Sequence, residues 1–123
     1  MTRTVYDILG ELRETNSESA LHSLLEAPNS VVPDIVEAFR SEKDANIRER
    51  LVFVIWHHKL PGTLDFLEEA FRDTADSVWK QALDGIVAIG GNEAVNLLRQ
   101  IQSATVTERL SWTDEAIEQL LSH

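Results

Sequence analysis

The sequence predicts an all-α protein, a short α-solenoid of about three to four antiparallel helix pairs that forms one domain over residues 1–123. Three observations support this prediction. Apolar residues recur at helical spacing along almost the whole chain, a unit of about 30 residues repeats, and the composition, with 43% hydrophobic and 26% charged residues, is that of a globular domain. The alternative is an all-α bundle without superhelical order.

Two helices are expected at the start of the chain. The first covers about Thr4 to Glu14 behind a Thr4 cap, because apolar side chains follow at i, i+3, i+4 and i+7 spacing. Asn16 or Ser17 caps a second, short helix. Pro28 ends that helix, because a proline disfavours helical backbone in the residue that precedes it.

The third helix starts after Ser30, and Pro33 fits its first turn, where a missing N–H loses no hydrogen bond. The fourth segment, from Asp44 or Asn46 to about His58, is ambiguous, because the run LVFVIW has the β-branched and aromatic content of a buried strand. Positions 47, 51, 54, 55 and 58 share one helical face, so a helix is predicted. Further apolar residues widen that face, and this helix is expected to be buried on several sides.

Two helices follow the helix breakers of the segment 59–62. Thr63 is expected to cap the fifth helix. The sixth helix starts at Asp76 or Ser77 and stops at Gly90-Gly91, since glycine adopts the left-handed backbone that closes a helix.

The last two helices are predicted from their caps. Asn92 is expected to cap the seventh helix and Thr113 the eighth, which runs to about Leu121. Trp112 and Ile117 have the spacing of a hydrophobic staple around the Thr113 cap.

A tetrapeptide reveals the internal repeat. Glu37–Arg40 (EAFR) recurs identically as Glu69–Arg72, 32 positions later and at the same place on the first helix of a pair. A third, weaker copy begins at Leu97. Helix–turn–helix units of this length are the sequence signature of an α-solenoid, in which each pair covers the apolar face of the next.

With this repeat the chain resembles HEAT-like, armadillo-type helical repeat proteins. The resemblance covers about residues 30–102, and its best unit is Leu64 to Gly91, with Asp73 at the turn between its two helices. The chain departs from the family pattern at two positions of the polar ladder between repeats. Trp79 replaces a basic residue, and Glu42 replaces the turn aspartate.

The charge of the chain excludes several classes of partner. Its 11 basic and 21 acidic residues give a formal net charge of −10 and a pI near 4.7, which opposes binding to nucleic acid or to anionic membranes. The formal net charge is −3 in residues 1–62 and −7 in residues 63–123. Such a field steers a basic protein partner, and simple solubility is the alternative reason for it.

No catalytic, cofactor or metal site is expected, and with 0 Cys there is no thiol chemistry. Adjacent helix residues point about 100° apart, so His57 and His58 do not chelate one ion together. His58 is interpreted as a partly buried core histidine with satisfied ring nitrogens. Glu18, His22 and Glu26 share one helical face, where local pairing is favoured over a cation site.

Three tryptophans are candidates for the core or for an interface. Trp56 is assigned to the core and Trp112 to the staple. For Trp79, packing between repeats is favoured over an exposed partner contact.

The favoured function is that of a non-enzymatic, cytoplasmic protein-binding module, specifically a small acidic immunity or inhibitor protein that covers a basic partner such as a nuclease toxin. The first residues lack the apolar stretch of a signal peptide, and the longest apolar run is six residues. The alternatives are a scaffold that acts by self-association or adaptor binding and, less favoured, a helical-repeat enzyme acting on nucleic acid. The fourth and sixth helices are expected to form the inner layer of the stack. They carry the predicted partner-binding residues: Arg48, Glu49, Trp79, Lys80, Gln81 and Asp84.

Overall fold

The computed structural model describes residues 4–104 and 109–122, and within them the protein is all-α, with eight α-helices, one short 3-10 turn and no strand. This confirms the predicted fold class at the level of secondary structure. The elements are α1 (Val5–Thr15), α2 (Glu18–Glu26), η1 (Asn29–Val31), α3 (Val32–Ser41), α4 (Ala45–His57), α5 (Thr63–Phe71), α6 (Asp76–Ile89), α7 (Gly91–Ala104) and α8 (Arg109–Leu121).

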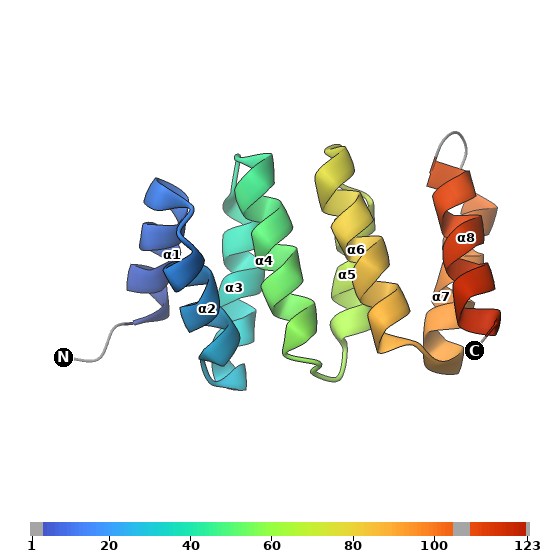
Figure 1. Cartoon of the computed structure of the whole chain (residues 1–123), viewed down its shortest axis with the longest axis horizontal. Coiled ribbons are helices and arrows are strands. Elements are labelled where there is room, and N and C mark those ends of the chain that lie inside the picture. Colours follow the sequence, from blue (N-terminus) through green and yellow to red (C-terminus); the bar gives the residue numbers. More distant parts are fainter. Residues whose placement is uncertain (1–3, 105–108, 123) are drawn as a thin grey trace.

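Successive helices lie side by side in pairs along the long axis of the molecule (Figure 1). The even-numbered helices form one layer and the odd-numbered helices the other, with α1 and α8 at opposite ends. The most extensive contacts join α4 to α6 and α5 to α6, so the centre of the row is held both within a pair and between neighbouring pairs. We call the surface formed by α2, α4, α6 and α8 the even-helix face.

Three helices begin at the residues that their caps predict. The hydroxyl of Thr4 accepts a hydrogen bond from the Asp7 N–H at 3.2 Å, and the Asp7 carboxylate accepts one from the Thr4 N–H at 3.1 Å, which completes a capping box. Ser17 caps α2 and Asp44 caps α4. Asn16 adopts φ 50° and ends α1, so the choice between Asn16 and Ser17 is decided for Ser17.

The predicted caps at Thr63 and Thr113 are wrong. Gly62, with φ 85°, precedes α5, and the Thr63 hydroxyl donates backwards to the Leu60 carbonyl. Helix α8 begins earlier than predicted, so Thr113 lies inside it, fully buried, and donates to the carbonyl of Arg109 at 2.9 Å. A threonine hydroxyl bonds equally well to a carbonyl one turn back, and a cap is therefore not its only role in a helix.

The other two predicted starts also need correction. Helix α7 begins at Gly91, which places Asn92 in its first turn. Ser30 lies in η1, and Val31 precedes α3 without a side-chain cap. Since Thr113 is not a cap, Trp112 does not form the predicted staple, and 44% of it is exposed.

The ambiguous fourth segment is a helix, as its spacing predicts. Helix α4 buries Leu51, Val52, Val54 and Ile55 almost completely. It contacts α2, α3, α5 and α6, which explains why apolar residues occupy so much of its circumference.

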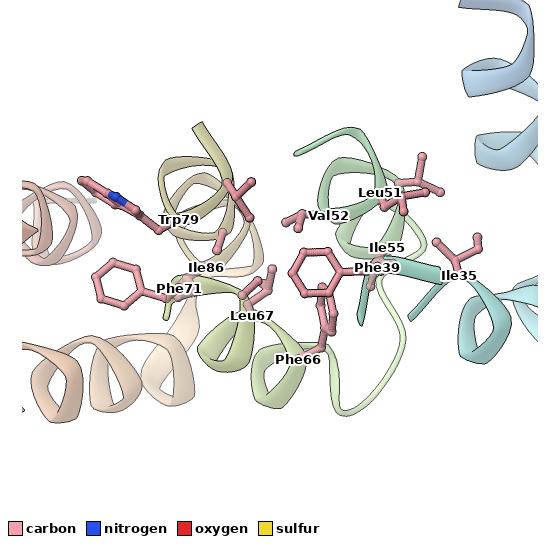
Figure 2. Close-up of a cluster of buried hydrophobic side chains, with 14 of the residues drawn as sticks. Ile35, Phe39, Leu51, Val52, Ile55, Phe66, Leu67, Phe71, Trp79 and Ile86 are labelled. Atoms are coloured by element: carbon pink, nitrogen blue, oxygen red, sulfur yellow. The ribbon is translucent and has the colours of Figure 1, made fainter. Parts of the chain in front are cut away.

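Side chains of α3, α4, α5 and α6 meet in one core between the two layers (Figure 2). The two phenylalanines of the repeated tetrapeptide are both buried in it, but Phe39 contacts the next helix pair and Phe71 contacts the second helix of its own pair. The Phe39 ring packs edge-on against Phe66 with centroids 5.2 Å apart, and Phe71 packs edge-on against Trp79 at 5.8 Å. Both are about 95% buried, with exposed fractions of 6% and 5%.

Polar side chains also join neighbouring helix pairs. The Arg40 guanidinium donates two hydrogen bonds to Glu69, at 2.9 and 2.8 Å, and these bonds lower the pKa of the Glu69 carboxyl. Arg40 and Glu69 come from the two copies of the EAFR tetrapeptide, so the repeat places complementary charges on adjacent odd-numbered helices. A second link joins Arg13 of α1 to Glu42, after α3, at 3.0 Å.

A glycine allows α4 and α6 to approach closely. A Cβ atom on Gly85 would lie 2.7 Å from Cδ1 and 2.8 Å from Cγ of Trp56. Gly85→Ala is therefore expected to lower the free energy of unfolding by about 1–2 kcal/mol, because the overpacking penalty exceeds the gain in helix propensity. Gly10→Ala in α1 is the control, because nothing lies within 4 Å of a Cβ atom placed at Gly10. The free energy of unfolding of this variant is expected to rise by about 0.5–1 kcal/mol.

Urea denaturation followed by circular dichroism measures both effects. Equal stabilisation of the two variants would show that α4 and α6 do not approach as closely as described.

Candidate protein-binding surface

The even-helix face carries a shallow depression of about 310 Å³ across α4. It contains two of the predicted partner-binding residues, Glu49 and Gln81, and both are half-buried. The other lining residues are Asn16, Leu21, Asn46, Arg50 and Phe53. The depression thus joins the start of α2 to the middle of α6 across the N-terminal half of α4.

Arg48 was predicted to contact a partner, but its guanidinium is occupied within the protein. Nε and Nη2 donate to the Asp73 carboxylate at 3.0 and 3.1 Å, and Nη1 donates to the carbonyls of Glu42 and Lys43. Only 15% of the Arg48 side chain and 12% of Asp73 is exposed. Arg48 therefore links the second and third helix pairs, and its guanidinium is engaged within the protein.

Trp79 is also misplaced in the predicted interface, because it is fully buried. Its indole N–H donates to Asp76 at 3.0 Å, and the Arg109 guanidinium of α8 lies 4.8 Å from its ring centroid. Arg109 also donates to the carbonyls of Phe71 and Asp73, at 2.7 and 2.8 Å. The packing interpretation of Trp79 is confirmed, since this ring fills the space between α6 and α8.

Lys80 and Asp84 lie on α6, away from the depression lining. The Lys80 ammonium lies 4.5 Å from the centroid of Trp112, so its charge is directed to the α6–α8 junction. Asp84 is exposed, yet neighbouring side chains exclude enough water to raise the pKa of its carboxyl. Within the described residues Asp84 forms no ion pair, which leaves its charge available at the surface.

The sequence interpretation missed an aromatic cluster on α4. Phe53, Trp56 and His57 contact one another, with the Trp56 and His57 rings stacked at a centroid distance of 3.7 Å. Trp56 is only partly buried, and its indole N–H donates to Gln81 at 2.9 Å. The signal was present, because Phe53 and Trp56 lie outside the inward stripe of this helix, but it was taken as a sign of deeper burial.

The two histidines behave differently. His58 is partly buried with both ring nitrogens in hydrogen bonds, to Asn29 at 2.8 Å and to the Leu24 carbonyl at 3.0 Å, which confirms its assignment as a satisfied histidine. His57 is exposed. Glu18 pairs with Arg50 of α4 at 2.8 Å, so its partner lies on a different helix and not on its own helical face as predicted.

Three further findings bear on the classes of function. Residues 4–104 and 109–122 contain no group of three or more His, Cys, Asp or Glu side chains arranged to hold a metal ion. No helix in this described part combines the length and the apolar character needed to cross a membrane. Comparison with known proteins finds no family model, no curated protein and no solved structure that matches the chain.

Proposed function

We propose that this chain is a HEAT-like α-solenoid that acts as a non-enzymatic protein-binding module, and that its even-helix face covers a basic protein partner. A cytoplasmic immunity or inhibitor protein that occludes a nuclease toxin is the most specific form of the proposal. The observation that carries it is the depression on α4, where exposed and half-buried polar side chains surround Phe53.

The helical repeat supports the solenoid part of the proposal. The EAFR copies lie at the C-terminal ends of α3 and α5, and Arg40 of one copy binds Glu69 of the other. Repeats that contact mainly their immediate neighbours are typical of stacked helix pairs. In such a stack one layer of helices presents an extended surface, which favours protein binding.

The charge distribution supports a basic partner. The chain has a net charge of −10, and the carboxylates of Glu49 and Asp84 form no ion pair within the described residues of the even-helix face. Unpaired acidic side chains raise the association rate of a positively charged protein and disfavour phosphate-bearing ligands.

Affinity capture with charge-reversed variants tests the proposal. Tagged protein is incubated with native lysate at low and at moderate salt, and bound proteins are identified by mass spectrometry. Asp84→Lys with Glu115→Lys reverses two exposed charges on the even-helix face, and Glu14→Lys with Glu93→Lys reverses two on α1 and α7. Both pairs change the net charge by the same amount.

A basic partner is expected to be retained by the wild type and by the α1/α7 variant, lost by the even-helix variant, and weakened by salt. Equal loss from both variants would mean that only the overall charge matters. Recovery of the chain alone would contradict a basic partner.

Self-association is the second candidate function, and two exposed apolar side chains favour it. Tyr6 of α1 is 67% exposed and Leu121 of α8 is 58% exposed, and these helices lie at the two ends of the row (Figure 1). Contact between such ends would extend the stack. Light scattering over a range of concentrations tests it, since a mass that stays at that of one chain would exclude assembly.

A further inference from the structure

We infer that the depression centred on Phe53 is an arginine-binding site, which takes one arginine side chain of the protein partner between the Phe53 ring and the Glu49 carboxylate. The inference rests on the proposed function and specifies where and by which chemistry the partner is recognised. Four observations on the described residues carry it.

First, an aromatic ring and a carboxylate lie one helical turn apart in the same depression. Glu49 and Phe53 are i, i+4 neighbours on α4, and both line the hollow. A guanidinium is a planar, weakly hydrated cation that packs on aromatic rings while its N–H groups donate to a carboxylate. The pair therefore offers the two contacts that an arginine side chain makes best.

Second, the Glu49 carboxylate in the depression has no ion-pair partner among the described residues. Arg50 lies beside Glu49, but its Nη2 donates to the Glu18 carboxylate at 2.8 Å, so its positive charge is already paired. Within the described residues Glu49 has no such partner. The local charge that remains is that of Glu49, and it selects a cation over an anion.

Third, the aromatic wall is held in place before any ligand arrives. The indole of Trp56 is fixed by its hydrogen bond to Gln81 and by stacking on His57, and the Phe53 ring lies edge-on to Trp56 at 5.8 Å. The approach of Gly85 to Trp56 closes the remaining space behind the ring. A preformed wall reduces the ordering cost of binding.

Fourth, the size of the depression suits a single side chain. Its volume is about 310 Å³, at the lower end of the range of small-ligand pockets. Its polar rim of Asn16, Asn46 and Gln81 provides further hydrogen-bonding groups around a charged head group.

NMR titration with short peptides tests the site. The probes are acetyl-Gly-Arg-Gly-amide and three matched peptides in which citrulline, lysine or glutamate replaces the arginine. Citrulline retains the shape of arginine without its charge. The three tryptophan indole N–H signals report position, because Trp56 contacts the lining residues Phe53 and Gln81 while Trp79 is buried and bonded to Asp76.

The arginine peptide is expected to shift the Trp56 indole signal and the backbone amides around Glu49 and Phe53, with the Trp79 signal unchanged. The lysine peptide is expected to bind more weakly than the arginine peptide, and the citrulline and glutamate peptides not at all. Glu49→Gln is expected to weaken the arginine peptide about fivefold. The control Glu14→Gln removes an exposed charge on α1 and is expected to leave binding unchanged.

Several results would overturn the inference. They are equal binding of the citrulline or lysine peptide, any binding of the glutamate peptide at this site, an unchanged affinity in Glu49→Gln, and no shift near Trp56. If the arginine peptide does not bind while capture of a basic partner still depends on Asp84 and Glu115, the arginine site is refuted and the proposed function stands. If the arginine peptide binds but no basic partner is captured, the proposed function is refuted.

Discussion

Replacing Trp79 with alanine is expected to lower the free energy of unfolding by about 3–5 kcal/mol. The ring is fully buried and packs against Phe71 and Trp112, at centroid distances of 5.8 and 6.2 Å. Removing it leaves a cavity between α6 and α8 and takes away the ring over which Arg109 lies. The carboxylate of Asp76 also loses the indole donor.

Urea denaturation followed by circular dichroism measures this loss without relying on tryptophan fluorescence. Trp112→Ala is the matched control, because it removes the partner ring of the same contact at a site that is 44% exposed. A loss of about 1 kcal/mol is expected there, since roughly half of the ring is already in water. Equal losses in the two variants would contradict the role of Trp79 as the central residue of the α6–α8 junction.

Breaking the Arg48–Asp73 link is expected to lower the free energy of unfolding by about 2–3 kcal/mol, because it leaves the remaining charge poorly solvated. The side chains of both residues are more than four-fifths buried, with exposed fractions of 15% and 12%. Asp73 has a second role, since the same carboxylate accepts the Ala75 N–H at 2.9 Å in the turn before α6. Arg48→Met is the appropriate change, because it retains most of the apolar stem.

A double-mutant cycle with Arg48→Met and Asp73→Asn isolates the pairwise energy, and a coupling of about 1–2 kcal/mol is expected. The Arg40–Glu69 pair supplies the control. It is also bidentate, but its side chains are 50% and 41% exposed, and solvent screening is expected to leave only a small fraction of that coupling. Equal couplings in the two cycles would show that burial does not govern the strength of the Arg48 link.

Helix positions could be predicted well from the sequence, whereas several helix starts could not. Apolar spacing together with cap residues identified all the described helices, including α4 with its strand-like composition. The caps at Thr4, Ser17 and Asp44 were predictable because each side chain bonds to backbone within its own first turn. Thr113 was not, because its hydroxyl can satisfy itself one turn back inside α8.

The candidate site was predicted only in part. Glu49 and Gln81 were among the residues predicted on the inner helices, and both line the depression. Phe53 was missed, because an apolar residue beside a core stripe looks the same in the sequence whether a neighbouring helix covers it or not. Arg48 was predicted to contact a partner, but its guanidinium bonds to Asp73 and to two backbone carbonyls. Trp79 was named among the partner-binding residues although packing between repeats was favoured for it, and the structure buries it fully.

By itself the sequence determined which segments are helical, which stripe of each helix is apolar and what net charge the protein has, because these depend on spacing within one helix and on composition. The tertiary structure alone decided how the helices pair, that Asp73 reaches Arg48, that Arg109 covers Trp79, and that Phe53 remains at the surface. The reason is physical: burial and ion pairing depend on which residue of a distant helix lies opposite, and periodicity along one helix carries no information about that neighbour.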